Sequence, residues 1–180
     1  KASWLIQRDG CIQVKLDVKK DMEFPFLPRF GLRLFLDQSL DRVRYCGMGP
    51  DESYPDKHQA SWHGIFEGDV RTMHRPYLKP QEYGSHWDCS WCEISGEEMS
   101  FQASSKEGFM FQACEYTQEE LSEKAHDFEL KEAGCTVLCL DHNQSGIGSG
   151  SCGPQLLEKY QFNEPEFSRT WVITPGKRKE

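Results

Sequence analysis

Short stretches in which apolar and polar residues alternate are the feature that most constrains how this chain can fold. Residues 12–18 alternate strictly, with four apolar side chains in seven positions, and Leu32, Leu34 and Leu36 share one face of another such stretch. Because successive side chains of a β-strand point to opposite faces, this period predicts strands with one buried face. The chain shows no strand–helix–strand rhythm. The pattern therefore predicts an all-β fold, a large antiparallel β-sandwich.

Turn residues and changes of pattern place the ends of about ten expected strands. A hairpin is expected over 4–18, with its turn at Asp9-Gly10. The other expected strands are 30–36, 42–48, 86–94, 99–104, 109–114, 137–141, 160–167 and 169–174.

Three further segments are expected between these strands. Gly49-Pro50 opens a long loop that runs to about Tyr77, and a glycine- and serine-rich loop covers 145–153. Thr117 followed by Glu120 has the spacing of a capping box, which predicts one short helix.

Composition limits the functions that the chain can have. The 180 residues correspond to about one domain, and 21 basic against 29 acidic residues give a net charge of −8. A nucleic-acid surface needs clustered positive charge, so no nucleic-acid partner is expected. No apolar run approaches the ~20 residues that span a bilayer, so no membrane is expected. The chain starts at Lys1 without Met, and apolar residues follow at once, so we expect a piece of a larger polypeptide.

We interpret the eight cysteines as reduced thiols that pack as small apolar residues. Cys89 and Cys92 form the one C-x-x-C spacing, but on the expected strand they point to opposite faces, which suits neither zinc nor a redox disulfide. Cys135 and Cys139 share a face of their strand but lie ~13 Å apart. Reduced thiols indicate a reducing compartment, and we expect a cytoplasmic location.

Two neighbouring acids, Asp51 and Glu52, are candidates for glycosidase chemistry, which in retaining enzymes needs two carboxyl groups ~5–5.5 Å apart. Adjacent side chains diverge, however, so we favour a capped turn that pins the loop. The six histidines show no His-x-His or His-x-x-x-His pair, so metal-binding spacing is absent.

Two other features could carry chemistry. The loop 146–154 presents the thiol of Cys152 but lacks the Gly-Lys-Ser/Thr of a phosphate loop. A nucleophilic thiol needs a paired histidine, and the nearness of His142 in sequence does not establish a contact. Most aromatic residues are expected in the core, although the following could form platforms for sugars: Tyr54, Trp62, Tyr77, Trp87, Trp91 and Trp171.

Five motifs occur in order along the chain: LPRFGL at 27–32, GMGPDESYPDK at 47–57, YLKPQEYG at 77–84, YTQEEL at 116–121 with His126, and GIG followed by SCGP at 146–154. Together they resemble the C-terminal small-chain domain (domain 5) of the bacterial β-galactosidases of glycoside hydrolase family 2. The resemblance covers about residues 27 to 154, and the flanks fit the strands of that family.

This resemblance implies that residues 1–180 are the C-terminal part of a galactose-mutarotase-like supersandwich, truncated at its N-terminal side. In the family this domain follows a jelly roll, two immunoglobulin-like domains and a catalytic (β/α)8 barrel. Such enzymes hydrolyse terminal non-reducing β-D-galactosides with retention, in carbohydrate metabolism. The catalytic Glu pair and the Mg²⁺ and Na⁺ sites belong to the barrel. The chain is therefore expected to contain no catalytic residue, metal site or cofactor, and to be inactive alone.

The resemblance further implies that Gly148, Ser151 and Cys152 form part of the wall of the substrate pocket. Some relatives carry at the position of Cys152 a Trp that stacks on the substrate, and others carry Cys. A thiol has less apolar area than an indole, so its contact is expected to be weaker, and no covalent chemistry is expected from it. The expected partners are a β-galactoside, the upstream domains of the same chain, and a second copy in a homo-oligomer.

The alternative is a free-standing carbohydrate-binding or aldose-1-epimerase-like β-sandwich. An epimerase needs a His and a Glu that converge at the anomeric carbon for proton transfer. The candidates are His63, His142 and Glu93, with no motif to support them. Truncation of a sandwich also predicts exposed apolar sheet surface and self-association.

Overall fold

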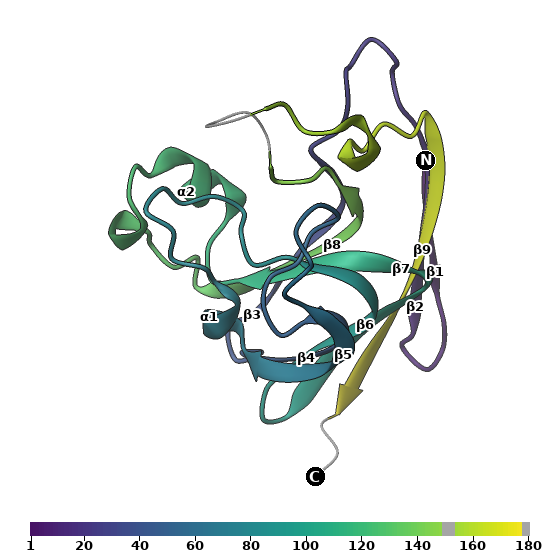
Figure 1. The fold of residues 1–180 in the computed structure, drawn as a ribbon. Coiled ribbons are helices and arrows are strands. Elements are labelled where there is room, and N and C mark those ends of the chain that lie inside the picture. The colour runs from purple at the N-terminus through teal and green to yellow at the C-terminus, as the bar shows by residue number, and fades with distance from the viewer. Residues whose placement is uncertain (149–153, 178–180) are drawn as a thin grey trace.

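The computed structural model describes residues 1–148 and 154–177, which fold into nine antiparallel strands and a few short helical segments (Figure 1). The helices are α1 (Val70–Met73) and α2 (Gln118–Glu123), with 3-10 turns at Asp127–Glu129 and Glu158–Tyr160. The strands are β1 (Ala2–Ile6), β2 (Ile12–Lys19), β3 (Arg29–Asp37), β4 (Arg42–Gly49), β5 (Trp62–Asp69), β6 (His86–Ser95), β7 (Met99–Cys114), β8 (Cys135–Gln144) and β9 (Glu166–Lys177). The predicted all-β class is confirmed, and the arrangement is consistent with a β-sandwich.

The long strand β7 joins the two parts of the sheet. One path runs β1-β2-β9-β7-β6-β4-β5, and β8 and then β3 extend from β7 as a branch. Residues 99–104 of β7 pair with β9, whereas 110–114 pair with β8. Between them lies Gly108 with a φ of +70°, a value that favours glycine, and the register with β6 shifts at the same point. The two predicted strands 99–104 and 109–114 are therefore one strand with a bend.

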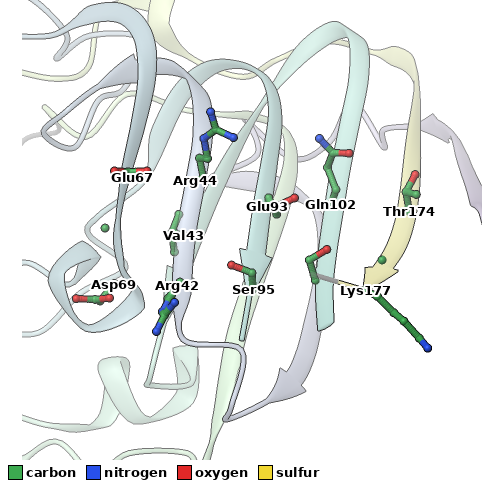
Figure 2. Close-up of a pocket in the computed structure, with 13 residues that line it drawn as sticks. Arg42, Val43, Arg44, Glu67, Asp69, Glu93, Ser95, Gln102, Thr174 and Lys177 are labelled. Carbon is green, nitrogen blue, oxygen red and sulfur yellow. The ribbon is translucent and has the colours of Figure 1, made fainter. Parts of the chain in front are cut away.

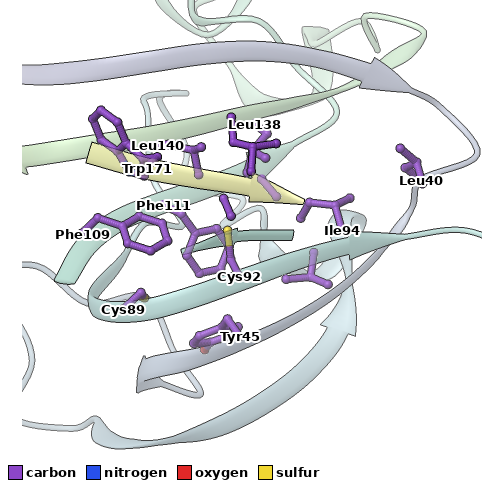
Figure 3. Packing of buried hydrophobic residues seen from close by; sticks show 14 of the residues in the cluster. Leu40, Tyr45, Cys89, Cys92, Ile94, Phe109, Phe111, Leu138, Leu140 and Trp171 are labelled. Carbon is purple, nitrogen blue, oxygen red and sulfur yellow. The ribbon is translucent and has the colours of Figure 1, made fainter. Parts of the chain in front are cut away.

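The core lies where the two parts of the sheet face each other. Side chains of β8 and β9 meet those of β4 and β6, and Leu138, Trp171, Tyr45 and Ile94 are almost fully buried (Figure 3). The alternating faces predicted for β2 and β3 are confirmed, because the apolar side chains on those faces belong to this cluster or pack against it.

The prediction that Cys89 and Cys92 point to opposite faces is wrong. Both thiols are buried in the same core cluster. The register between β6 and β7 shifts on both sides of Cys89, and the preceding Asp88 has a φ of +53°. Such irregularities change the phase of the alternation, so that residues three apart face the same side. The seven cysteines among the described residues are free thiols.

Strand β5 and helix α1 lie where the sequence predicts a continuous loop. β5 is at the end of the sheet, and the side chains of Trp62 and Ile65 are mostly exposed. Its pattern was missed because an edge strand buries little, and because Gly64 and Gly68 interrupt the apolar residues that favour a strand.

The predicted strand at 160–167 is also wrong. Its first residue ends a 3-10 turn, and a continuous β9 begins only at Glu166 and includes the predicted strand 169–174. Phe162 is buried, but it forms only an isolated bridge to Leu27. Pro165, which has no N–H to donate to a ladder, directly precedes β9.

The predicted helix is confirmed as α2. The Thr117 side chain accepts a hydrogen bond from the Glu120 backbone N–H at 3.1 Å, as an N-cap should.

Candidate functional site

The glycine-rich loop that follows β8 begins as a firmly held segment. The Ser145 N–H donates to the Pro28 carbonyl at 2.9 Å, and the Gly146 N–H donates to the Tyr160 carbonyl at 2.9 Å. Of the three predicted pocket residues, Gly148 lies in the described part of this loop. Ser151 and Cys152 lie outside the described residues.

The Asp56 carboxylate holds the next two residues of the loop. Oδ1 accepts the Ile147 N–H at 3.0 Å, and Oδ2 accepts the Gly148 N–H at 2.8 Å. A Cβ atom on Gly146 would overlap the Asp56 carboxylate, and one on Gly148 would lie 3.0 Å from Oδ2. The glycines therefore allow an approach to Asp56 that a larger residue would obstruct.

Glu52 is a second anchor, and it holds the segment that carries Asp56. Its buried carboxylate accepts four hydrogen bonds. The donors are Lys57 Nζ at 2.5 Å, Tyr77 OH at 2.5 Å, Tyr54 OH at 3.0 Å and Gly84 N–H at 2.9 Å. Burial alone would raise the pKa of Glu52, but the hydrogen bonds from Lys57, Tyr77 and Gly84 hold it below its ordinary value.

The interpretation of Asp51 and Glu52 as parts of a pinned turn is confirmed. Asp51 points outward and pairs with Arg75 at 2.7 Å, whereas Glu52 points inward to its four donors. The two carboxylates are therefore bound to different partners, unlike a glycosidase pair, in which both carboxyl groups act on one glycosidic bond.

A cavity of about 450 Å³ opens beside this turn. Lys57, the residue after Asp56, lies on its wall, and so does the half-exposed ring of Tyr77. The lining residues are Asp51, Glu52, Lys57, His58, Gln59, Ala60, Ser61, Arg75 and Tyr77.

A partly buried ionic network supports the end of β8 from which the loop departs. Arg29 on β3 is ion-paired with Asp141 and Glu82, and Gln144 donates to Asp141 Oδ2 at 2.8 Å and to Ser85 Oγ at 3.1 Å. Buried charges are tolerated when they are paired and hydrogen-bonded in this way. The network ties β3, β8 and the segment before β6 together behind the loop.

Another cavity, of about 830 Å³, lies at the other end of the sheet (Figure 2). It is an open groove over the start of β4, whereas the segment with Asp56 follows the end of β4. Arg44 stands opposite Glu67 on β5 and Glu93 on β6, so basic and acidic side chains alternate across the strands. This pattern is typical of a solvated sheet face, and we do not assign the groove to the site.

The residues suggested for an epimerase are not brought together. Glu93 on β6 pairs with Arg44 of β4, whereas His63 on β5 pairs with Met48, towards the other end of β4. His142 lies on β8, where its Nδ1 accepts from Arg169 Nε at 3.0 Å and its ring stacks on Phe167 with centroids 4.3 Å apart.

The aromatic residues divide between core and surface. Tyr54 and Trp171 are fully buried, and Trp87 packs against His58 in a tilted arrangement with ring centroids 4.5 Å apart. Trp62 is exposed on β5, and Trp91 receives Arg44 over its ring. Of the suggested sugar platforms, Tyr77 is the one that lines the cavity beside Asp56.

The described ranges contain no group of three or more His, Cys, Asp or Glu side chains that could hold a metal ion. No helix in the same part of the chain is long and apolar enough to cross a membrane.

The antiparallel sheet, and the loop after β8 that Asp56 holds, agree with the type of domain that the sequence motifs indicate. The family described as "Beta galactosidase small chain" matches residues 1–173. The chain belongs to the β-galactosidase small-chain family, and it corresponds to the C-terminal domain of these proteins.

Relatives named beta-galactosidase occur in bacteria and in yeast. The chain is 44% identical to the one from Actinobacillus pleuropneumoniae over 162 residues, which are 90% of this chain and 16% of the relative. It is 39% identical to that of Staphylococcus xylosus, over 92% of this chain and 17% of the relative. Identity to the Kluyveromyces lactis protein is 34%, over 80% and 14% respectively. The chain thus spans about one sixth of the length of these relatives.

Proposed function

We propose that this chain is the part of a retaining β-galactosidase that completes the substrate pocket, within an enzyme that hydrolyses terminal β-D-galactosides. The observation that carries the proposal is the family match over residues 1–173, together with relatives that bear the name beta-galactosidase. The firmly anchored loop at 146–148 supports it, because a pocket wall must be held in place to contribute to binding.

In this proposal the carboxyl groups that break the glycosidic bond lie outside the chain, in the catalytic barrel of the parent enzyme. The acids of the pinned turn support this division. Glu52 already accepts four hydrogen bonds, so it has no free lone pair directed at a substrate. Asp51 is engaged with Arg75 at the surface.

Gly148, Ser151 and Cys152 are proposed as the contribution of this chain to the pocket. Glycine at 148 lets the backbone come close to a sugar. A thiol at 152 offers a small apolar surface, which fits a role in shaping the pocket rather than in covalent catalysis.

The Mg²⁺ and Na⁺ of such enzymes do not fit the described residues, which lack a suitable cluster of ligands, and we assign these ions to the barrel. The free thiols, four of them buried in the described ranges, support a reducing, cytoplasmic location. The proposed partners are the β-galactoside, the upstream domains and a second copy of the parent. Neither nucleic acid nor a membrane is proposed.

The test is to change Cys152 in the full-length parent enzyme and to measure the hydrolysis of a nitrophenyl β-D-galactoside. Cys152→Trp should lower KM, because an indole adds apolar contact area, whereas Cys152→Ala should leave kcat within about twofold of wild type. Cys135→Ala, on the half-buried start of β8, is the control. A parent that cleaves no β-galactoside, or a Cys152→Ala variant without any activity, would contradict the proposal.

A further inference from the structure

We propose that Asp56 is a positioning residue for the substrate pocket. It acts through the loop 146–148, which its carboxylate holds by two backbone hydrogen bonds. This inference rests on the proposed function, because the loop matters for turnover only if it forms part of the pocket.

The two hydrogen bonds from Ile147 and Gly148 to the Asp56 carboxylate are called the Asp56 clamp below. Each carboxylate oxygen accepts a different N–H, from Ile147 at 3.0 Å and from Gly148 at 2.8 Å. Hydrogen bonds to an ionised carboxylate are about twice as strong as those between neutral groups. Two of them on successive residues fix both the position and the orientation of the loop backbone.

The residues that precede and follow Asp56 in the chain are themselves held in place. Tyr54 is fully buried and exchanges backbone hydrogen bonds with Lys57, at 2.8 Å and 3.1 Å, around the clamp residue. The Lys57 side chain is held by the Glu52 carboxylate. The clamp is therefore mounted on a rigid turn, as precise positioning requires.

Fixing Gly148 matters because Cys152 follows four residues later in the chain. Loss of the clamp would remove the fixed starting point of the segment proposed to meet the sugar. We therefore expect weaker substrate binding in the ground state and the transition state alike, which raises KM and leaves kcat nearly unchanged. If Asp56 only stabilised the fold, its loss would leave KM constant and would lower the apparent kcat, because unfolding lowers the amount of active enzyme.

The experiment compares three variants of the full-length parent. Asp56→Ala removes both acceptors, and Asp56→Asn keeps one of them. Asp51→Asn is the matched control, since Asp51 lies in the same turn but pairs only with Arg75 among the described residues. For a nitrophenyl β-D-galactoside, Asp56→Ala should raise KM about tenfold with kcat within about twofold. Asp56→Asn should fall between Asp56→Ala and wild type, and Asp51→Asn should match wild type.

A second readout does not depend on activity. Hydrogen exchange of the Ile147 and Gly148 amides, followed by peptide mass spectrometry on the folded parent, should speed up at least about fivefold in Asp56→Ala and stay unchanged in Asp51→Asn. Thermal melting of each variant shows that the enzyme is folded during both assays.

The outcomes separate the two proposals. An inactive wild-type parent overturns the proposed function, and the exchange rate of the Ile147 and Gly148 amides then still decides whether Asp56 positions the loop. An active parent in which Asp56→Ala leaves both KM and the amide exchange rate unchanged overturns the role of Asp56. A fall in kcat at constant KM, with unchanged amide exchange at Ile147 and Gly148, also overturns it, because that result is expected for a residue that only stabilises the fold.

Discussion

At Glu52, one buried carboxylate holds together a turn, a lysine, two tyrosines and the backbone of Gly84. Oε1 faces two donors and Oε2 faces two others. An amide at this position would point its NH₂ group at donors and would leave Lys57 without its ion pair.

We therefore expect Glu52→Gln to lower the free energy of unfolding by about 2–3 kcal/mol, as for the loss of hydrogen bonds to a charged group. Chemical denaturation in urea measures the change. The exposed Glu98→Gln should have an effect within about 0.5 kcal/mol of zero. Equal stability of Glu52→Gln and wild type would show that the anchor contributes nothing to the fold.

His86 makes stability depend on pH. Burial, opposed only in part by a hydrogen bond to the Met48 carbonyl, lowers the pKa of His86 to about 4. An unfolded chain takes up this proton near pH 6.5, whereas the folded chain takes it up only near pH 4. The contribution of His86 is thus complete above pH 6.5 and is lost as the pH falls from 6.5 to 4, by up to about 1.4 kcal/mol per pH unit.

His86→Phe, which keeps a ring between Tyr45 and Phe111, should remove this part of the pH dependence. Denaturation curves at several pH values between 4 and 6.5 give the slope. His63→Gln, at an exposed site on β5, is the control and should keep the wild-type slope. If the slope is the same for His86→Phe and wild type, His86 is not the group responsible.

Among the elements, β3 and β8 come unusually close at Gly31. A Cβ on this residue would overlap the Leu140 carbonyl oxygen and come within 2.7 Å of Asp141 Oδ1. The register of the two strands shifts at the same point, between Phe30 and Gly31. The close approach lets Arg29 reach Asp141 in the network behind the loop.

Gly31→Ala should therefore destabilise the chain by about 2–3 kcal/mol, the upper part of the range for overpacked sites. Gly68→Ala on β5 is the matched control, because its Cβ would meet only the ends of the Met73 and Thr72 side chains, at 3.2 Å. Thermal or urea denaturation compares the two. If Gly31→Ala lowered the free energy of unfolding by less than Gly68→Ala, the close approach of β3 and β8 at Gly31 would not be needed for stability.

How far the sequence could predict these elements depends on the kind of signal. The strict alternation of β2 and the N-cap at Thr117 are local signals, and both predictions were confirmed. The irregularities in β6 are not local, since they arise where β7 changes partner, and they reversed the predicted face of Cys92. The edge strand β5 lacked the buried face that produces a pattern.

The same distinction applies to the candidate site. The motifs and the glycines identified the loop, and a pinned turn at Asp51 and Glu52 was predicted from adjacent residues. The clamp between Asp56 and Gly148 joins positions 92 residues apart, so no local pattern could have predicted it. The predicted roles of Ser151 and Cys152 remain predictions, because these residues lie outside the described ranges.

On the scale of the whole molecule, the described sheet has three strands paired on one side only, β1, β3 and β5. β1 carries Trp4, Leu5 and Ile6, each more than half exposed. Unpaired edges with apolar side chains favour pairing with another chain.

The purified 180-residue chain should therefore associate with itself as its concentration rises, and Leu5→Lys should weaken the association, because a charged side chain disfavours strand pairing at an edge. Size-exclusion chromatography with light scattering over a range of concentrations measures it. Lys15→Arg, which keeps the charge on β2, serves as the control. A clean monomer at high concentration would contradict the prediction.

The central claim is that this chain shapes a β-galactoside pocket while other parts of the parent enzyme break the bond. The most direct measurement is the hydrolysis of a nitrophenyl β-D-galactoside by the purified chain, compared with the full-length parent at equal molar concentration. The account predicts turnover by the parent and none above the buffer rate by the chain alone. Cleavage by the chain alone, abolished by changing one of its own acids such as Asp51 or Glu52, would contradict it.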